Sequence, residues 1–179
     1  MSLLRHYRFR PSLVVLHWLT LALLAAVYAT MELRGLFPRG SVPREAMKTA
    51  HYFLGLAVFA VTLLRLVLRA TGHTPPINPP PPAWQAVLAR IVALAMYALM
   101  LAMPVIGYLI LGADGKAPAI GGWSLPVLVP GSMPADALGS WHEGIALAGY
   151  WLVGLHAAAA LYHHHIRGDN TLLRMSLRR

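Results

Sequence analysis

Four histidines lie within long apolar stretches of this 179-residue chain, namely His17, His51, His142 and His156. An ionisable side chain is costly inside an apolar membrane span, so a histidine in such a position is expected to have a function. His142 and His156 are 14 residues apart, which on one α-helix places them within about 40° of the same face and about 21 Å apart along the axis. One helix would therefore present two imidazoles to its neighbours, at two depths.

The other two histidines match these two depths. His17 lies near the start of the first apolar stretch, and His156 lies in the closing half of the fourth. His51 lies near the start of the second stretch, and His142 opens the fourth. Because successive spans run in opposite directions, we pair His17 with His156 at one level and His51 with His142 at the other.

Two neutral imidazoles that meet inside a helical bundle suit a haem iron with two axial histidine ligands. The chain has nine histidines and no cysteine, so thiolate and iron–sulfur chemistry are excluded. Gly149 stands halfway between His142 and His156 and would leave room for a flat macrocycle, although close helix packing explains a glycine there equally well. The histidines therefore predict two haem b groups, with the iron bound by the pairs His17/His156 and His51/His142.

Two other interpretations of the histidines stay open. Any one of them could hydrogen-bond a neighbouring helix, although four at two matching depths make coincidence a poor explanation. Zinc is a second alternative, but it usually takes four ligands, often cysteines or carboxylates.

The composition requires that lipid surround most of the chain. Apolar residues make up 58% of it, charged residues only 12%, and the mean hydropathy is +0.58, whereas about 25% of a globular domain is charged. Stretches poor in charge and long enough to span a bilayer predict helices over about 11–32, 46–68, 88–112 and 142–165. The expected fold is all-α, a single domain over residues 1–179 that forms an integral membrane four-helix bundle in the lipid bilayer.

Two features of the predicted helices and connections bear on the site. Arg65 lies near the end of the second helix, where we expect its long side chain to snorkel outward to the membrane surface. Residues 74–82 are rich in proline and predict a stiff, extended connector.

The distribution of lysine and arginine predicts the orientation. Ten lie at the two termini and in the second connection: Arg5, Arg8, Arg10, Arg65, Arg69, Arg90, Arg167, Arg174, Arg178 and Arg179. Five lie in the first and third connections: Arg34, Arg39, Arg44, Lys48 and Lys116. Both termini are therefore expected in the cytoplasm, and the formal charge of +9 reflects membrane topology rather than nucleic-acid binding.

His163, His164 and His165 lie together at the cytoplasmic end of the fourth helix, and His163 continues the face of His156. They form either an interfacial cluster or a source of hydrogen bonds and protons for a substrate beside the inner haem, since histidine titrates near neutral pH.

Six segments spread over nearly the whole chain resemble the bacterial cytochrome b561 family, with the closest likeness to its membrane-bound superoxide oxidases. They are His17-Trp18, Met31–Arg39, Pro104–Gly107, Ser140–Glu143, Leu155–Leu161 and Asp169–Met175. The resemblance implies a multi-pass protein of the bacterial inner membrane with two haem b groups held by the four histidines. It also implies an activity, in which periplasmic superoxide is oxidised to dioxygen and the electrons pass through the haems to ubiquinone.

This activity assigns roles at both ends of the bundle. On the outer side, Arg34, Arg39 and Lys48 are expected to attract the superoxide anion, with interfacial anchoring as the alternative. On the inner side, His163 and His164 are expected to bind ubiquinone. Related sequences tend to carry lysines in the connector where this chain has prolines at residues 79–82, which makes His163 the better candidate.

Two further functions remain to be distinguished from this one. A cytochrome b subunit that links a partner dehydrogenase or hydrogenase to the quinone pool would need the same four histidines. A haem-free transporter of protons or metal ions would use intramembrane histidines differently. For superoxide oxidation a protein partner is not required.

Overall fold

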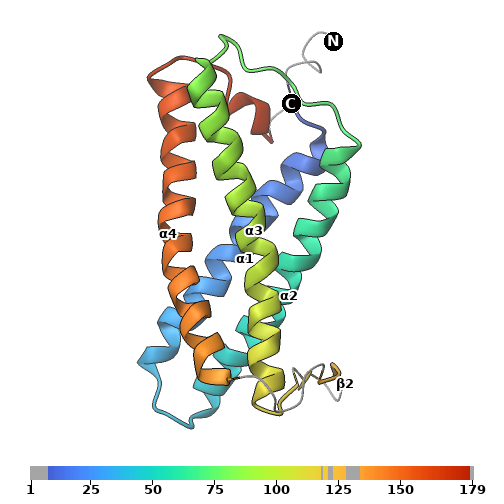
Figure 1. Cartoon of the computed structure of the whole chain (residues 1–179), viewed down its shortest axis with the longest axis vertical. Coiled ribbons are helices and arrows are strands. Elements are labelled where there is room, and N and C mark those ends of the chain that lie inside the picture. Colours follow the sequence, from blue (N-terminus) through green and yellow to red (C-terminus); the bar gives the residue numbers. More distant parts are fainter. Residues whose placement is uncertain (1–7, 118, 121–122, 128–133, 178–179) are drawn as a thin grey trace.

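The computed structural model describes residues 8–117, 119–120, 123–127 and 134–177 (Figure 1). Its four long helices are α1 (Pro11–Leu33), α2 (Val42–Ala70), α3 (Ala83–Ala113) and α4 (Ala135–His165). One 3₁₀ turn (Arg34–Leu36) follows α1, and another (Leu173–Met175) lies near the C-terminus. Apart from the two-residue antiparallel strands β1 (Ala119–Ile120) and β2 (Trp123–Ser124), the regular structure of the described chain is helical.

Proline marks the start of all four helices. It occupies the first turn of α1 and α2 and the position immediately before α3 and α4, where its fixed φ and missing N–H cost little. Helices α2, α3 and α4 consequently begin at 42, 83 and 135, several residues before the predicted starts at about 46, 88 and 142. The predicted spans begin close to charged residues because they were limited to stretches poor in charge. A helix can nevertheless carry charges in a turn that lies beyond the apolar core of a bilayer.

The outer surface of the bundle is apolar. All four helices are long and apolar enough to cross a membrane, and large side chains such as Trp151 (78% exposed) and Leu94 (71% exposed) point outward. An exposed apolar surface this extensive is not stable in water. The structure therefore agrees with a four-helix membrane bundle.

Neighbouring helices in the chain are neighbours in space, α1 with α2, α2 with α3 and α3 with α4 (Figure 1). Successive helices run in opposite directions, so the starts of α1 and α3 and the ends of α2 and α4 lie at one end of the bundle. That end also carries residues 8–10 and the C-terminal segment. Three of the arginines counted for the orientation, Arg5, Arg178 and Arg179, lie outside the described residues.

A C-terminal cap, residues 166–177, ties the proline-rich connector to the end of the bundle. Asn170 Oδ1 accepts from the backbone N–H of Asn78 at 2.9 Å, and the backbone N–H of Asn170 donates to the Asn78 carbonyl at 3.1 Å. The guanidinium of Arg174 donates to the Pro75 carbonyl at 2.6 Å. Prolines lack a backbone N–H, so the connector can form few hydrogen bonds within itself. Side chains of the cap therefore bond its remaining backbone groups, the Asn78 N–H and the Pro75 carbonyl.

The same cap also holds the N-terminal segment. The guanidinium carbons of Arg69 and Arg174 lie 4.9 and 5.1 Å from the centre of the Phe9 ring. Trp18 of α1 donates its indole N–H to the Met175 carbonyl at 2.9 Å. Segments from the beginning, middle and end of the chain thus meet at one end of the bundle.

Candidate functional site

The structure brings the four intramembrane histidines together in the two predicted pairs. The ring centres of His17 on α1 and His156 on α4 are 6.2 Å apart, with the ring planes at 59°. Those of His51 on α2 and His142 on α4 are also 6.2 Å apart, with the planes at 71°. Helix α4 contributes one imidazole to each pair.

This separation matches two imidazoles that bind one metal from opposite sides. An imidazole nitrogen lies about 2.0–2.1 Å from a bound metal, and the centre of a five-membered ring with bonds of about 1.33 Å lies about 1.1 Å from each atom. Two rings on opposite sides of one ion therefore have their centres about 6.3 Å apart. Both observed pairs fit bis-histidine ligation of a haem iron.

We use outer and inner for the two ends of the bundle after the predicted orientation, so that His51 and His142 form the outer pair and His17 and His156 the inner pair. The outer pair borders a cavity of about 840 Å³ formed by all four helices, which we call the outer cavity. Two of its glycines leave space beside the imidazoles. A Cβ on Gly107 would lie 3.3 Å from His142 Cε1, and a Cβ on Gly55 would meet nothing within 4 Å. The cavity is of the size that proteins use for cofactors.

Hydrogen bonding prepares His51 to be a metal ligand. Its Nδ1 lies 3.1 Å from the Val27 carbonyl, which can only accept, so this nitrogen carries the proton and Nε2 keeps its lone pair. Metal-binding histidines commonly donate their second N–H to a carbonyl in this way. His142 Nδ1 is buried and has no hydrogen-bond partner among the described residues.

The inner pair has a different neighbour, the guanidinium of Arg65. Its Nη2 lies 3.3 Å from His17 Nδ1, and its Nη1 donates to the Thr20 hydroxyl at 3.2 Å. The expectation that Arg65 snorkels outward is wrong. The side chain turns toward α1 because the Thr20 hydroxyl and the ring of Tyr97, 5.7 Å from the guanidinium carbon, provide polar contacts inside the bundle.

Gly149 is buried at a helix contact. A Cβ there would meet the Tyr28 hydroxyl and lie 3.2 Å from Leu99 Cδ2, and Gly149 does not line the outer cavity. These contacts explain the glycine by close packing of α4 on α1 and α3. Its predicted role beside a macrocycle remains a prediction.

An outer cluster of polar side chains was not anticipated from the sequence. Tyr28 donates to the Ala146 carbonyl at 2.9 Å, Tyr150 donates to Glu32 at 2.8 Å, and the two tyrosine rings lie 4.2 Å apart. All four residues line the outer cavity. A spacing of 11 residues places Tyr28 within about 20° of His17 on the helix, and that spacing could have revealed it.

The three outer cations predicted to attract superoxide occupy different surroundings. Arg34 lines the outer cavity. Lys48 forms an ion pair with Glu45 at 2.7 Å, and Arg39 is exposed away from the cavity. Glu32, Asp114 and Glu143 also line the cavity, so its lining carries more acidic residues than the predicted basic site would have.

At the inner end, the predicted histidine cluster is organised around Asp169. This carboxylate is buried (2% exposed) and lies 2.7 Å from His163 Nδ1, while the Asp169 carbonyl lies 3.1 Å from His164 Nδ1. Burial alone would raise the pKa of the Asp169 carboxyl. Hydrogen bonds from Thr171 and His163 outweigh burial and hold this pKa below its usual value, so Asp169 is a carboxylate at neutral pH.

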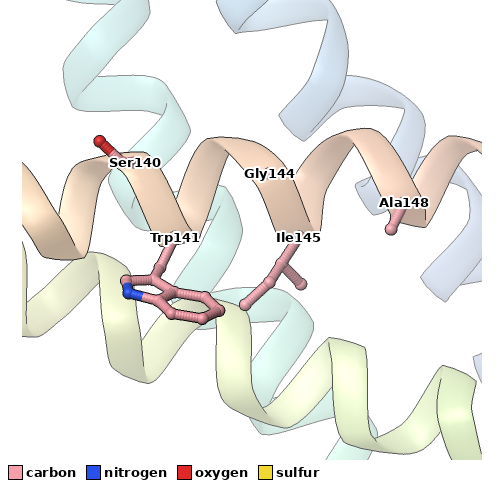
Figure 2. Close-up of a pocket in the computed structure, with 5 residues that line it drawn as sticks. All are labelled: Ser140, Trp141, Gly144, Ile145 and Ala148. Atoms are coloured by element: carbon pink, nitrogen blue, oxygen red, sulfur yellow. The ribbon is translucent and has the colours of Figure 1, made fainter.

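A second, shallower hollow of about 430 Å³ lies on the outside of α4 and has no ionisable side chain (Figure 2). Ser140, Trp141, Gly144, Ile145 and Ala148 line it. Trp141 is 69% exposed, as expected for an aromatic residue at the membrane interface. The hollow is therefore attributed to contact with lipid.

An apolar four-helix bundle with inward-facing histidine pairs defines a membrane cytochrome of the b type. Comparison with known proteins agrees. A family model described as prokaryotic cytochrome b561 matches residues 8–176. The chain belongs to the prokaryotic cytochrome b561 family, and it is accordingly a multi-pass bacterial membrane protein for electron transfer that binds haem b.

Individual relatives match over most of their length. Cytochrome b561 homolog 1 of Escherichia coli K12 is 40% identical over 96% of this chain and 98% of its own. A protein of Yersinia pestis named probable superoxide oxidase CybB is 35% identical over 95% of this chain and 96% of its own. Cytochrome b561 homolog 2 of E. coli K12 is 33% identical over 70% and 68% of the two chains.

Replacing Gly149 with alanine tests the helix contact. We expect Gly149→Ala to displace Tyr28 and Leu99 and to lower the free energy of unfolding by about 1–3 kcal/mol, measured as reduced thermal stability of the purified protein. Gly154→Ala on the same helix is the matched control, because a Cβ there meets nothing within 4 Å. Equal stability of the two variants would contradict the packing role.

Proposed function

We propose that this protein is a di-haem b oxidoreductase of the bacterial inner membrane that oxidises periplasmic superoxide and reduces ubiquinone. The observation that carries the proposal is the pair of histidine pairs, each with ring centres 6.2 Å apart and both anchored on α4. Each pair would hold one haem, so the two sites would lie at two depths of one bundle. The superoxide step draws its support from the Yersinia pestis relative, whose name includes that activity.

The proposed orientation follows from the excess of lysine and arginine at the end that carries the cap. Both termini then lie in the cytoplasm. His17 and His156 would hold the inner haem, and His51 and His142 would hold the outer haem beside the outer cavity.

Reduction of one ubiquinone requires two electrons. Each superoxide gives up one electron and leaves as dioxygen, whereas ubiquinone takes two electrons and two protons to become the quinol. Two haems supply one-electron carriers between these half-reactions. Two superoxide ions are therefore oxidised for each quinone reduced, and the chain's own residues must supply binding and protons.

At the outer cavity, Arg34 is the proposed contact for superoxide, because it is the predicted cation that lines the cavity. Arg39 and Lys48 would add attraction at longer range, which salt weakens. The neighbouring carboxylates of Glu32, Asp114 and Glu143 act against an anion, so the position of Arg34 matters more than the net charge of the opening.

At the inner end, His163 is the proposed hydrogen-bond and proton donor to ubiquinone, with His164 beside it. Asp169 accepts from His163 Nδ1 at 2.7 Å, which fixes the ring and favours a proton on the nitrogen that faces the carboxylate. The other nitrogen is then the one that can exchange a proton with a bound quinone. This arrangement resembles the carboxylate–histidine pairs that transfer protons in enzymes.

A second candidate function is favoured by the acidic lining of the outer cavity. An electron-transfer subunit would receive electrons from a partner dehydrogenase or hydrogenase, and carboxylates around the outer haem would suit a basic docking surface. In that case superoxide would not reduce the haems quickly, and the quinone site would remain the same.

Replacement of the ligands tests the two haem sites. The wild-type protein should contain two haems per chain, measured from its haem-to-protein ratio and its reduced-minus-oxidised spectrum. His17→Ala and His156→Ala should remove mainly one haem, and His51→Ala and His142→Ala mainly the other. If every variant lost both haems equally, the proposed pairing would lack support.

The superoxide step is tested with purified protein, a superoxide source and a quinone analogue. We expect superoxide to disappear faster than by spontaneous dismutation, and Arg34→Gln to slow haem reduction by roughly tenfold at low salt. Glu143→Gln, which removes an opposing charge from the same cavity, should speed the reaction. No acceleration by the wild-type protein would exclude superoxide oxidation and leave the partner-linked function.

The quinone step is tested separately by reoxidation of prereduced haems with a quinone analogue. His163→Ala should slow this step by roughly 100-fold, and Asp169→Asn should slow it less, because asparagine keeps an acceptor but lacks the charge. His165→Ala is the control, since its ring contacts His164 rather than Asp169. Equal effects on reduction by superoxide and on reoxidation would argue against a site specific to quinone.

A further inference from the structure

Arg65 has no carboxylate partner among the residues that the structure describes. The chain has six acidic residues. Five of them lie in or beside the two connections at the far end of the bundle: Glu32, Glu45, Asp114, Asp136 and Glu143. The sixth, Asp169, is already bound by His163 and Thr171.

The polar contacts of Arg65 satisfy only part of its guanidinium. Nη1 donates to Thr20, Nη2 faces His17, and Nε is buried without a hydrogen-bond partner among the described residues. A guanidinium has five N–H donors, stays charged in proteins and is costly to bury without an anion. The position of Arg65 therefore calls for an acceptor that the described part of the chain does not provide.

Haem ligation would remove one of these contacts. An arginine can only donate, so its contact with His17 Nδ1 requires a lone pair on that nitrogen. Iron bound to Nε2 of a neutral imidazole places the proton on Nδ1 instead. Arg65 would then keep the Thr20 hydroxyl and the Tyr97 ring and would have free donors beside His17.

We propose that Arg65 binds a propionate carboxylate of the inner haem and raises the reduction potential of that haem. The inference rests on the proposed function, since that function supplies the haem. Haem b carries two carboxylates, and a carboxylate is the anion that a planar guanidinium binds best. Arg65 is thus a positioning residue for the inner cofactor.

The charge of Arg65 has a consequence for the direction of electron flow. A cation near a redox centre favours its reduced form, and this effect is strong in an interior of low dielectric constant. The outer cavity, in contrast, has three carboxylates and one arginine in its lining. The inner haem would therefore be the more easily reduced of the two, which drives electrons from the outer haem to the inner haem.

The test is a potentiometric titration of the full-length protein in nanodiscs of zwitterionic lipid, followed by haem absorbance. The component that is missing from His17→Ala identifies the inner haem. We expect Arg65→Gln to shift this component to more negative potential, so that its reduced-to-oxidised ratio at the wild-type midpoint falls about tenfold. Arg65→Lys keeps the positive charge, so the inner haem should retain most of its wild-type potential. Arg69→Gln, which removes a cation near the Phe9 ring, should leave the potentials of both haems unchanged.

Selective loss of the inner haem from Arg65→Gln, with the outer haem retained and Arg65→Lys loaded normally, would also support the proposal. Unchanged potentials of both haems in Arg65→Gln would overturn it and would point to another anion, such as a lipid phosphate. An equal shift or loss of both haems would overturn it as well. A wild-type protein without haem would refute the proposed function itself, which distinguishes that failure from failure of this inference.

Discussion

Polar groups in the spanning part of this protein must find partners inside the protein, because the hydrocarbon of the bilayer offers none. The Thr20 hydroxyl donates to the Leu16 carbonyl at 2.7 Å and also accepts from Arg65. Tyr28 reaches the Ala146 carbonyl on α4. Two of the imidazoles follow the same constraint, since Nδ1 is directed to a carbonyl in His51 and to Arg65 in His17, whereas His142 Nδ1 has no partner among the described residues. The hydrogen bonds between these polar groups therefore constrain how the helices pack against one another.

Much of the fold and of the candidate site could be predicted from the sequence, because it depends on lengths and spacings along the chain. The length of the apolar stretches predicts the helices, and the 14-residue spacing on α4 together with the alternating direction of the spans predicts which histidines meet. The surroundings of the histidines depend instead on rotation and approach of different helices. The inward turn of Arg65, the contact between Tyr28 and Gly149, and the carboxylates beside Arg34 could not be derived from spacing within one helix.

The cap at the inner end connects fold and site. Asn170 and Arg174 hold the connector, and Asp169, next to Asn170, holds His163. A stiff proline-rich connector has few conformations to lose on folding, which makes it a suitable base for the C-terminal segment. The residues proposed to deliver protons are therefore positioned by contacts with segments from three parts of the chain.

The presence of His142 and His156 on one continuous helix limits how the protein can change in length. An insertion of a single residue between them would turn one imidazole by about 100° and move it by only about 1.5 Å. Its partner on α1 or α2 would then face a different side chain. Changes of three or four residues, about one full turn, would return both rings to the same face, but they would alter the depth between the two sites by about 5 Å. The segment between the two ligands is thus fixed in length by helical geometry, whereas the connections outside the bundle are not.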